Sequence, residues 1–216
     1  DFARRLVPQD FSGFIVDAGA YIGISSLVFA RYFPRATVLA IEPSSENFAL
    51  LQKNVAQQPN VRALHAALLP QASPRVGLYD INVGEWGYTT TESGPSSELT
   101  RVMEFAPGLA LRDLGIPLNE IGLLKLDIEG GEVGAIKGMQ ILLKEDRPKL
   151  ALEVHPVNIR EQGQSPQSIV DFIRELVPSY EVSVLPDYRN SGDDATVPFP
   201  ENYRWTNRPA MLYFQE

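Results

Sequence analysis

The chain contains no cysteine and no long uninterrupted run of apolar residues. The lack of cysteine excludes disulfide bonds, thiolate metal sites and cysteine nucleophiles. It is compatible with a reducing compartment, so we expect a cytoplasmic protein. No apolar run approaches the roughly 20 residues that a membrane span requires, so we expect no membrane partner. No signal peptide is evident, but the chain begins at Asp1 rather than at a methionine, so its first residues do not decide targeting.

Positive charge is also scarce, because 19 Lys and Arg residues stand against 27 Asp and Glu residues, for a net charge of −8. Contacts to phosphate supply most non-specific affinity for nucleic acid, so this balance disfavours a nucleic-acid partner. The 216 residues are 44% hydrophobic and 21% charged, which is typical of a globular protein. We therefore expect a single domain, residues 1–216, with a sizeable core. The sequence does not indicate an oligomeric state.

The stretch from Phe14 to Gly23 has the pattern of a buried strand, a glycine turn and the first turn of a helix. Gly19 can adopt backbone angles closed to other residues, so the chain can reverse sharply there. The amide groups at the start of the following helix favour an anionic ligand group. An ordinary strand-to-helix connection has the same pattern, so this stretch alone does not establish a ligand site.

Two later strands also end in acids, at Glu42 and at Asp127. A strand, a glycine turn, a helix and a second strand ending in an acid form half of a Rossmann unit, in which the acid binds ribose hydroxyls. The turn is G-x-x-x-G, however, and lacks the closely spaced glycines of the dinucleotide turn G-x-G-x-x-G. A nicotinamide-dependent oxidoreductase is therefore the weaker alternative.

Hydrophobic periodicity predicts alternating strands and helices, for which parallel strands with right-handed crossovers are the expected solution. A helix start is indicated at Ser44 or Ser45, and Ser165 with Pro166 indicates another. Residues 1–12 are a candidate N-terminal arm, and the Gly-, Ser- and Thr-rich residues 82–98 are a candidate substrate loop. The expected strands are 14–17, 37–41, 61–64, 75–81, 99–105, 123–126, 150–154, 180–185 and 210–214; the expected helices are 24–33, 45–55, 109–114, 132–143 and 166–176.

Several segments between Phe14 and His155 resemble the FkbM family of S-adenosylmethionine (SAM)-dependent O-methyltransferases. Residues 124–132 and 147–155 carry the most specific likeness. In the first of these segments, every fixed position of the family's L-K-I-D-V-E-G-x-E holds a residue of the same chemical class. Residues 17–23 match its D-V-G-A-N-x-G, except that Tyr21 stands where asparagine is usual. Glu42 and Pro43 match its E-P, and residues 65–67 lie where it has N-A-A.

The resemblance implies an α/β, Rossmann-like class I methyltransferase fold: a mostly parallel seven-stranded sheet, helices on both faces and a late antiparallel strand. It implies SAM as the cofactor and a hydroxyl on a small molecule, sugar or natural product as the acceptor. A non-catalytic SAM-binding module is a further alternative. The residues expected to contact the cofactor are Asp17, Gly19, Tyr21, Gly23, Glu42, Pro43, His65, Ala66 and Asp127.

Three acids, Asp127, Glu129 and Glu132, follow the strand at 123–126. We expect Asp127 to face the methyl-donor end of the cofactor, and Glu129 or Glu132 to orient a hydroxyl acceptor. Alternatively, the acids merely complement a helix dipole. Lys125 lies inside a parallel strand, where a lysine is costly to bury alone, so we expect an ion pair with Glu153 or Asp17.

His155 follows the next strand and is our candidate general base, because a hydroxyl must lose its proton during methyl transfer. A capping or packing histidine is the alternative. Asp127, Glu129 and His155 could instead hold a divalent metal, but no tight ligand spacing supports this, and we expect no metal site. Trp86 and Tyr88 are expected either in a substrate lid or as core anchors.

Overall fold

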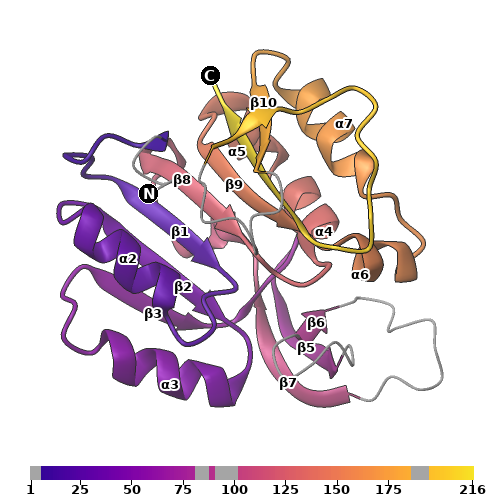
Figure 1. Cartoon of the computed structure of the whole chain (residues 1–216). Helices are drawn as coiled ribbons and strands as arrows, with labels where there is room; N and C mark the ends of the chain where they lie inside the picture. Colours follow the sequence, from indigo (N-terminus) through magenta and orange to yellow (C-terminus); the bar gives the residue numbers. More distant parts are fainter. Residues whose placement is uncertain (1–5, 81–87, 91–101, 186–194) are drawn as a thin grey trace.

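The structure, a computed structural model, describes residues 6–80, 88–90, 102–185 and 195–216. In these segments the main sheet has eight strands in the order β11–β10–β12–β9–β8–β1–β2–β3 (Figure 1). Neighbouring strands among β3, β2, β1, β8 and β9 pair in parallel, and β12 inserts antiparallel between β9 and β10. The strands are Phe14–Ala18 (β1), Thr37–Glu42 (β2), Val61–His65 (β3), Ile121–Leu126 (β8), Lys149–Val154 (β9), Glu181–Leu185 (β10), Val197–Pro198 (β11) and Ala210–Gln215 (β12).

A second, four-stranded sheet lies below the main one in Figure 1 and has the order β4–β7–β5–β6. Its strands β5 and β7 form an antiparallel pair, and β4 runs parallel to β7. The segment between β3 and β8 therefore leaves the main sheet and builds a separate layer. The four strands are Ala67–Leu68 (β4), Ser73–Asp80 (β5), Tyr88–Thr90 (β6) and Val102–Leu109 (β7).

Helices cover both faces of the main sheet because its strands are apolar on both sides. One face carries Val16, Leu124 and Leu152, which pack with residues of α4, α5 and α7. The opposite face is covered by α2 and α3, where Phe29 packs in the cluster of Ile15 and Leu123. The helices are Ile24–Tyr32 (α2), Ser45–Val55 (α3), Glu132–Gly138 (α4), Gln140–Glu145 (α5), Pro156–Glu161 (α6) and Gln167–Leu176 (α7), with 3₁₀ turns at Leu111–Leu114 and Leu118–Glu120.

The predicted fold class is confirmed, with the two-residue β11 as an additional edge strand. Ser44 is the N-cap of α3 and accepts a hydrogen bond from the Asn47 amide at 3.4 Å. Of the predicted N-terminal arm, Leu6 and Val7 are buried in the cluster that contains Phe29. None of the helices in the described part of the chain has the length and apolar character needed to cross a bilayer.

Three local predictions are wrong in detail, and one helix was not predicted. The single helix expected over 132–143 is divided at Met139, and the Ser165 side chain makes no cap bond, because α7 begins at Gln167 after Pro166. The strand expected at 99–105 is β7, which begins at Val102, and α6 was not predicted at all. The periodicity of so short a helix is too brief to detect.

The division of the helix lies where Gly138 meets Pro70. A Cβ atom added at Gly138 would lie 2.4 Å from the Pro70 Cα, whereas one added at Gly134 would meet the Pro70 ring at an ordinary 3.5 Å. The backbone at Gly138 therefore approaches the segment after β4 more closely than any other residue type would allow.

We expect Gly138→Ala to lower the free energy of unfolding by about 1–3 kcal/mol, because backbone atoms must move apart. Gly134→Ala is the matched control on the same helix and should raise it by about 0.5–1 kcal/mol through the better helix propensity of alanine. Urea unfolding followed by circular dichroism measures both. Equal effects of the two substitutions would contradict the close approach at Pro70.

Candidate functional site

The first part of the site is the turn after β1, which lies against the end of β2. Gly19 has a φ of 76°, and a Cβ atom there would lie 1.7 Å from the Asp127 carbonyl oxygen. Tyr21 also has a positive φ, of 52°, and its amide donates to Glu42 Oε2 at 2.9 Å. The Ser44 amide donates to Glu42 Oε1 at the same distance. The two amides hold the Glu42 carboxylate in one orientation at the end of β2.

Burial raises the pKa of Glu42 above its usual value, although the Ser44 and Tyr21 amides and Lys125 oppose this effect. The side chain is only 5% exposed. Each carboxylate oxygen can accept more than one hydrogen bond, so two fixed amide contacts leave acceptor capacity for ligand hydroxyls.

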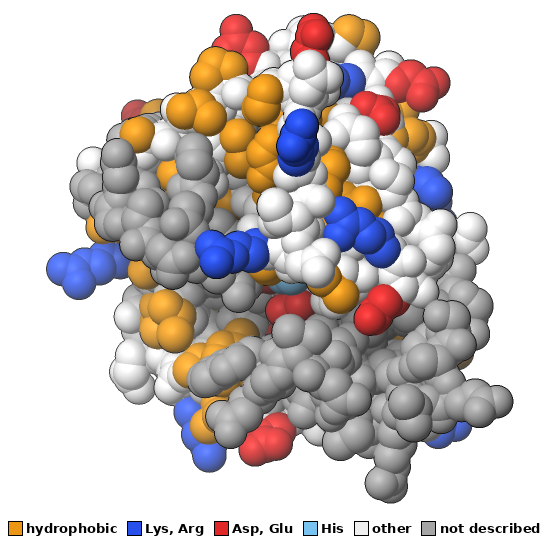
Figure 2. All heavy atoms as spheres, turned by 45° about the vertical axis from the view of Figure 1, so that its right-hand side comes forward, with side chains coloured by type: hydrophobic (Ala, Val, Ile, Leu, Met, Phe, Trp, Pro, Cys, Tyr) orange, Lys and Arg blue, Asp and Glu red, His pale blue; other side chains and the backbone are white. Residues whose placement is uncertain are grey.

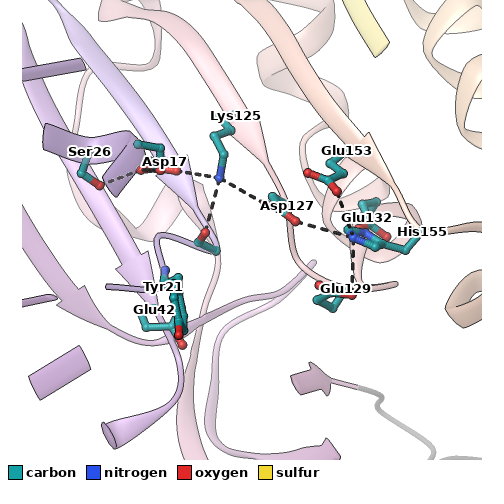
Figure 3. A network of polar contacts seen from close by, with 12 residues as sticks. Asp17, Tyr21, Ser26, Glu42, Lys125, Asp127, Glu129, Glu132, Glu153 and His155 are labelled. Atoms are coloured by element: carbon teal, nitrogen blue, oxygen red, sulfur yellow. Dashed lines mark hydrogen bonds and ion pairs between the residues drawn. The ribbon is translucent and has the colours of Figure 1, made fainter. Parts of the chain in front are cut away.

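Lys125 connects β8 to this turn through buried contacts (Figure 3). Its Nζ lies 2.9 Å from Asp17 Oδ1 and donates to the Gly19 carbonyl oxygen at 3.3 Å. Burial alone would lower the pKa of Lys125, but Asp17 and Asp127 raise it well above its usual value, so the ammonium stays charged. The expected ion pair with Asp17 is confirmed.

Asp17 is fully buried, and its Oδ2 accepts hydrogen bonds from the Ser25 and Ser26 hydroxyls at 2.6 Å each. Its complete burial favours a role in holding the turn over the direct cofactor contact expected from the sequence. The contacts join β1, β8 and the first turn of α2 into one unit.

His65 lies at the end of β3, beside Glu42 in the register of the sheet. Its Nε2 is 2.9 Å from the Pro43 carbonyl oxygen, so that nitrogen carries the proton and donates it. The ring stacks on Phe48 with a centroid separation of 4.9 Å. His65 thus fixes the chain that leaves β2, and Ala66 beside it is buried.

The second part of the site is a cluster of acids around His155, at the ends of β8 and β9 (Figure 3). The His155 Nδ1 lies 2.8 Å from Glu132 Oε1. Its Nε2 lies 3.4 Å from a Glu129 oxygen, 3.6 Å from a Glu153 oxygen and 3.7 Å from an Asp127 oxygen. Figure 2 shows acidic side chains and a histidine at the bottom of a recess in the surface.

Burial and neighbouring charges shift the pKa values in this cluster. Burial raises the pKa of Asp127 to about 7; Lys125 and His155 oppose this effect, whereas Glu153 and Glu129 add to it. For His155, burial would lower the pKa, but the hydrogen bond to Glu132 and the nearby carboxylates raise it to about 10. With these neighbours alone, the raised pKa favours the imidazolium at neutral pH, a form that cannot act as the general base expected from the sequence.

The structure brings the predicted catalytic residues together, but it does not place Glu132 where we expected it. Glu132 is fully buried and bonded to His155, so it cannot orient an acceptor directly. Asp127 and Glu129 are the partly open members, with side chains 30% and 25% exposed. Trp86, the side chain of Tyr88 and most of the expected loop 82–98 lie outside the described residues.

Sequence reasoning missed four residues of the site. Ser25 and Ser26 bind Asp17, and they stand among apolar residues that suggest only a helix. Glu153 was considered only as a partner for Lys125, although it lies on β9 two residues before His155, which directly follows that strand, and this spacing was a usable signal. Asn158 donates to the Glu129 carbonyl oxygen and side chain, and nothing in the sequence pointed to it.

A family profile described as the methyltransferase FkbM domain matches residues 17–180. The chain belongs to the FkbM methyltransferase family. Methyltransferase 1 of Beauveria bassiana is 28% identical over 158 residues, which cover 64% of this chain and 63% of that protein. Methyltransferase sdnD of Sordaria araneosa is 33% identical over 158 residues, which cover 58% of this chain and 60% of that protein. The match therefore spans less than two thirds of either relative.

Solved structures agree on the fold. The FkbM methyltransferase of Methylobacillus flagellatus aligns with a TM-score of 0.63 at 19% identity and covers 99% of this chain, but only 46% of that protein. Precorrin-6y C5,15-methyltransferase of Geobacter metallireducens aligns with a TM-score of 0.53 at 14% identity, covering 98% of this chain and 83% of that one. Family and fold together support SAM as the cofactor.

The residues around the glycine turn fit this cofactor. The turn after β1 leaves no room for a side chain at Gly19, and the Glu42 carboxylate is oriented beside it by backbone amides. An oriented acid beside a glycine turn suits ribose hydroxyls and the amino-acid end of a nucleoside sulfonium.

We expect Lys125→Met to lower the free energy of unfolding by about 3–5 kcal/mol, because it leaves the Asp17 carboxylate buried without its cation. The double variant Asp17→Asn/Lys125→Met should recover part of that loss. Arg147→Met is the control, because it breaks an exposed ion pair with Glu216 and should cost about 1 kcal/mol or less. Urea unfolding of the parent, Asp17→Asn, Lys125→Met, the double variant and Arg147→Met is the measurement, and additive effects at Asp17 and Lys125 would contradict the coupling.

Proposed function

We propose that this FkbM-family chain transfers a methyl group from SAM to a hydroxyl oxygen of a small molecule, sugar or natural product. The observation that carries the proposal is the placement of two differently built groups at one edge of the sheet. The Glu42 carboxylate, held by two amides, ends β2, and the acid cluster around His155 lies beyond β8 and β9. Parallel strands bring both to the edge where ligands bind in open α/β sheets.

Glu42 would accept hydrogen bonds from the ribose hydroxyls, and the turn from Gly19 to Gly23 would receive the amino-acid end. The Pro43 and His65 segment would border the adenine, because the His65–Pro43 bond fixes this segment next to Glu42. Tyr21 contributes its amide by holding Glu42. Asp17 acts indirectly, through Lys125 and the Gly19 carbonyl oxygen.

The bound cofactor supplies an electrophilic methyl group on a sulfonium, and the protein must align an acceptor oxygen with it. Positioning of this kind supplies about 7–11 kcal/mol of a barrier. A new C–O bond forms as the C–S bond breaks, and the acceptor proton must leave. Asp127 and Glu129 are the partly exposed acceptors for that proton, with His155 directly behind them at 3.7 and 3.4 Å.

Three alternatives have less support. A nicotinamide-dependent oxidoreductase would need the dinucleotide turn, which the sequence lacks. A non-catalytic SAM-binding module would not need an acid cluster next to the cofactor edge. A putative rRNA methylase of Clostridium thermocellum shares the fold at 8% identity, but the net charge of −8 disfavours a nucleic-acid acceptor.

Glu42→Gln should weaken SAM binding at least about tenfold, because a neutral amide accepts fewer hydrogen bonds and meets the two backbone amides with only one acceptor oxygen. Isothermal titration calorimetry with SAM measures this effect. Glu46→Gln is the matched control, since Glu46 is exposed on the first turn of α3. If the two variants bind SAM equally well, the ribose role of Glu42 is wrong.

Asp127→Asn should lower kcat by about 10²–10⁴-fold, the usual contribution of general acid–base catalysis, while SAM binding stays within a few-fold of the parent. The measurement is transfer of an isotope-labelled methyl group to a panel of hydroxylated small molecules, with Glu181→Gln as the exposed control. Unchanged turnover in Asp127→Asn would remove it as the proton acceptor. Absence of transfer to any hydroxyl compound, despite tight SAM binding, would favour the non-catalytic module.

A further inference from the structure

His155 Nε2 is a buried ring nitrogen that makes no hydrogen bond in the described structure. The residue is only 4% exposed. Its nearest polar neighbours are oxygens of Glu129, Glu153 and Asp127, at 3.4, 3.6 and 3.7 Å. Buried polar groups of this kind are normally hydrogen-bonded or bound to a metal.

The other ring nitrogen determines how Nε2 can act. Nδ1 is 2.8 Å from Glu132 Oε1, and a carboxylate oxygen can only accept, so Nδ1 carries the proton. In a neutral ring, Nε2 then presents its lone pair to the three carboxylates. A histidine that donates one N–H to a carboxylate and directs its other nitrogen at a cation is the usual arrangement of a metal-binding histidine.

The spacing around Nε2 also suits a cation better than a hydrogen. An N–H···O bond is about 2.7–3.2 Å long, which is shorter than all three distances. Two ligand atoms held about 2.1 Å from one ion at tetrahedral angles stand about 3.4 Å apart. Three residues, Asp127, Glu153 and His155, each offer one ligand atom, and these three atoms lie within 4.8 Å of one another.

The charges around His155 also favour a bound cation. The ring nitrogens of His155 have carboxylates of four residues within 2.8–3.7 Å, and mutual repulsion makes such a group costly unless positive charge lies among them. An imidazolium supplies one positive charge, and a divalent cation supplies two. The cation would also let His155 remain neutral and would satisfy Nε2 directly.

We propose that Asp127, Glu153 and His155 Nε2 bind a divalent cation, with Glu132 positioning the imidazole. This differs from the set considered in the sequence, because Glu153 replaces Glu129 as a ligand. One nitrogen and two carboxylate ligands suit borderline cations such as Zn²⁺ or Mn²⁺ better than Ca²⁺, which prefers oxygen ligands alone. The inference goes beyond methyl transfer; while the cation is bound, Glu129 rather than Asp127 takes the acceptor proton. The test of the cation site requires neither cofactor nor acceptor.

The two histidines of the chain make the test specific, because His65 is an internal control. Protein labelled with ¹⁵N-histidine is treated with a chelator, dialysed and titrated with Zn²⁺, and the imidazole nitrogens are followed by NMR. We expect His155 Nε2 to lose its proton and move to a metal-bound shift at one equivalent, while Nδ1 stays protonated through Glu132. The His65 resonances should not change.

The near-isosteric variant Glu153→Gln should weaken Zn²⁺ binding at least tenfold by calorimetry, and Glu132→Gln should weaken it by about 10–100-fold as an outer-shell change. Glu181→Gln is the matched control: it is exposed, and it pairs with Gln215 at the end of β10 away from the site. Thermal unfolding without Zn²⁺ shows whether each variant is folded.

Three outcomes would overturn the proposal: no response of His155 to Zn²⁺, an equal response of both histidines, or unchanged affinity in a folded Glu153→Gln. Because this titration contains no SAM, its failure would not affect the proposed methyl transfer. A failure of SAM binding would likewise leave the cation site standing.

Discussion

The buried contact between Asp17 and Lys125 is the interaction on which the site depends. Lys125 Nζ lies 2.9 Å from Asp17 and also holds the Gly19 carbonyl oxygen, so one ammonium ties β8 to the turn after β1. Ser25 and Ser26 complete the shell of Asp17 from the first turn of α2. A lysine inside a parallel strand would be costly without such partners, and here the cost is offset by fixing the turn where the cofactor is expected.

Asp127 connects this pair to the second half of the site. One of its oxygens is 3.7 Å from Lys125 Nζ and the other is 3.7 Å from His155 Nε2. A charge placed on either side therefore changes the electrostatic potential at the other through one carboxylate (Figure 3). Asp127 lies between the edge where the cofactor is expected and the acid cluster, so its carboxylate interacts electrostatically with charges on both sides.

Two of the three non-glycine residues with positive φ in the described segments, Tyr21 and Glu129, lie at this edge of the sheet. Gly19, Tyr21 and Gly23 in the first turn have positive φ angles, as do Glu129 and Gly130 after β8. Left-handed angles cost a non-glycine residue about 1–2 kcal/mol. Tyr21 stands where the FkbM family usually has asparagine, a residue that tolerates this region better. The Tyr21–Glu42 hydrogen bond is one contact that holds it there.

The sequence by itself determined most of the succession of strands and helices along the chain, the glycine turn and the acids at the ends of β2 and β8, because periodicity and turn residues act over a few neighbouring positions. It also predicted an acidic partner for Lys125, either Asp17 or Glu153, because burying a lysine without one is costly; the structure selects Asp17. Only the tertiary structure decided which acids surround His155. Glu132 turns inward and Glu153 joins the cluster, because strands and helix starts that are distant in the chain meet there. The same long-range packing decided the helix break at Met139, where Gly138 meets Pro70. Such contacts depend on the order of strands in the sheet, which no local pattern of residues encodes.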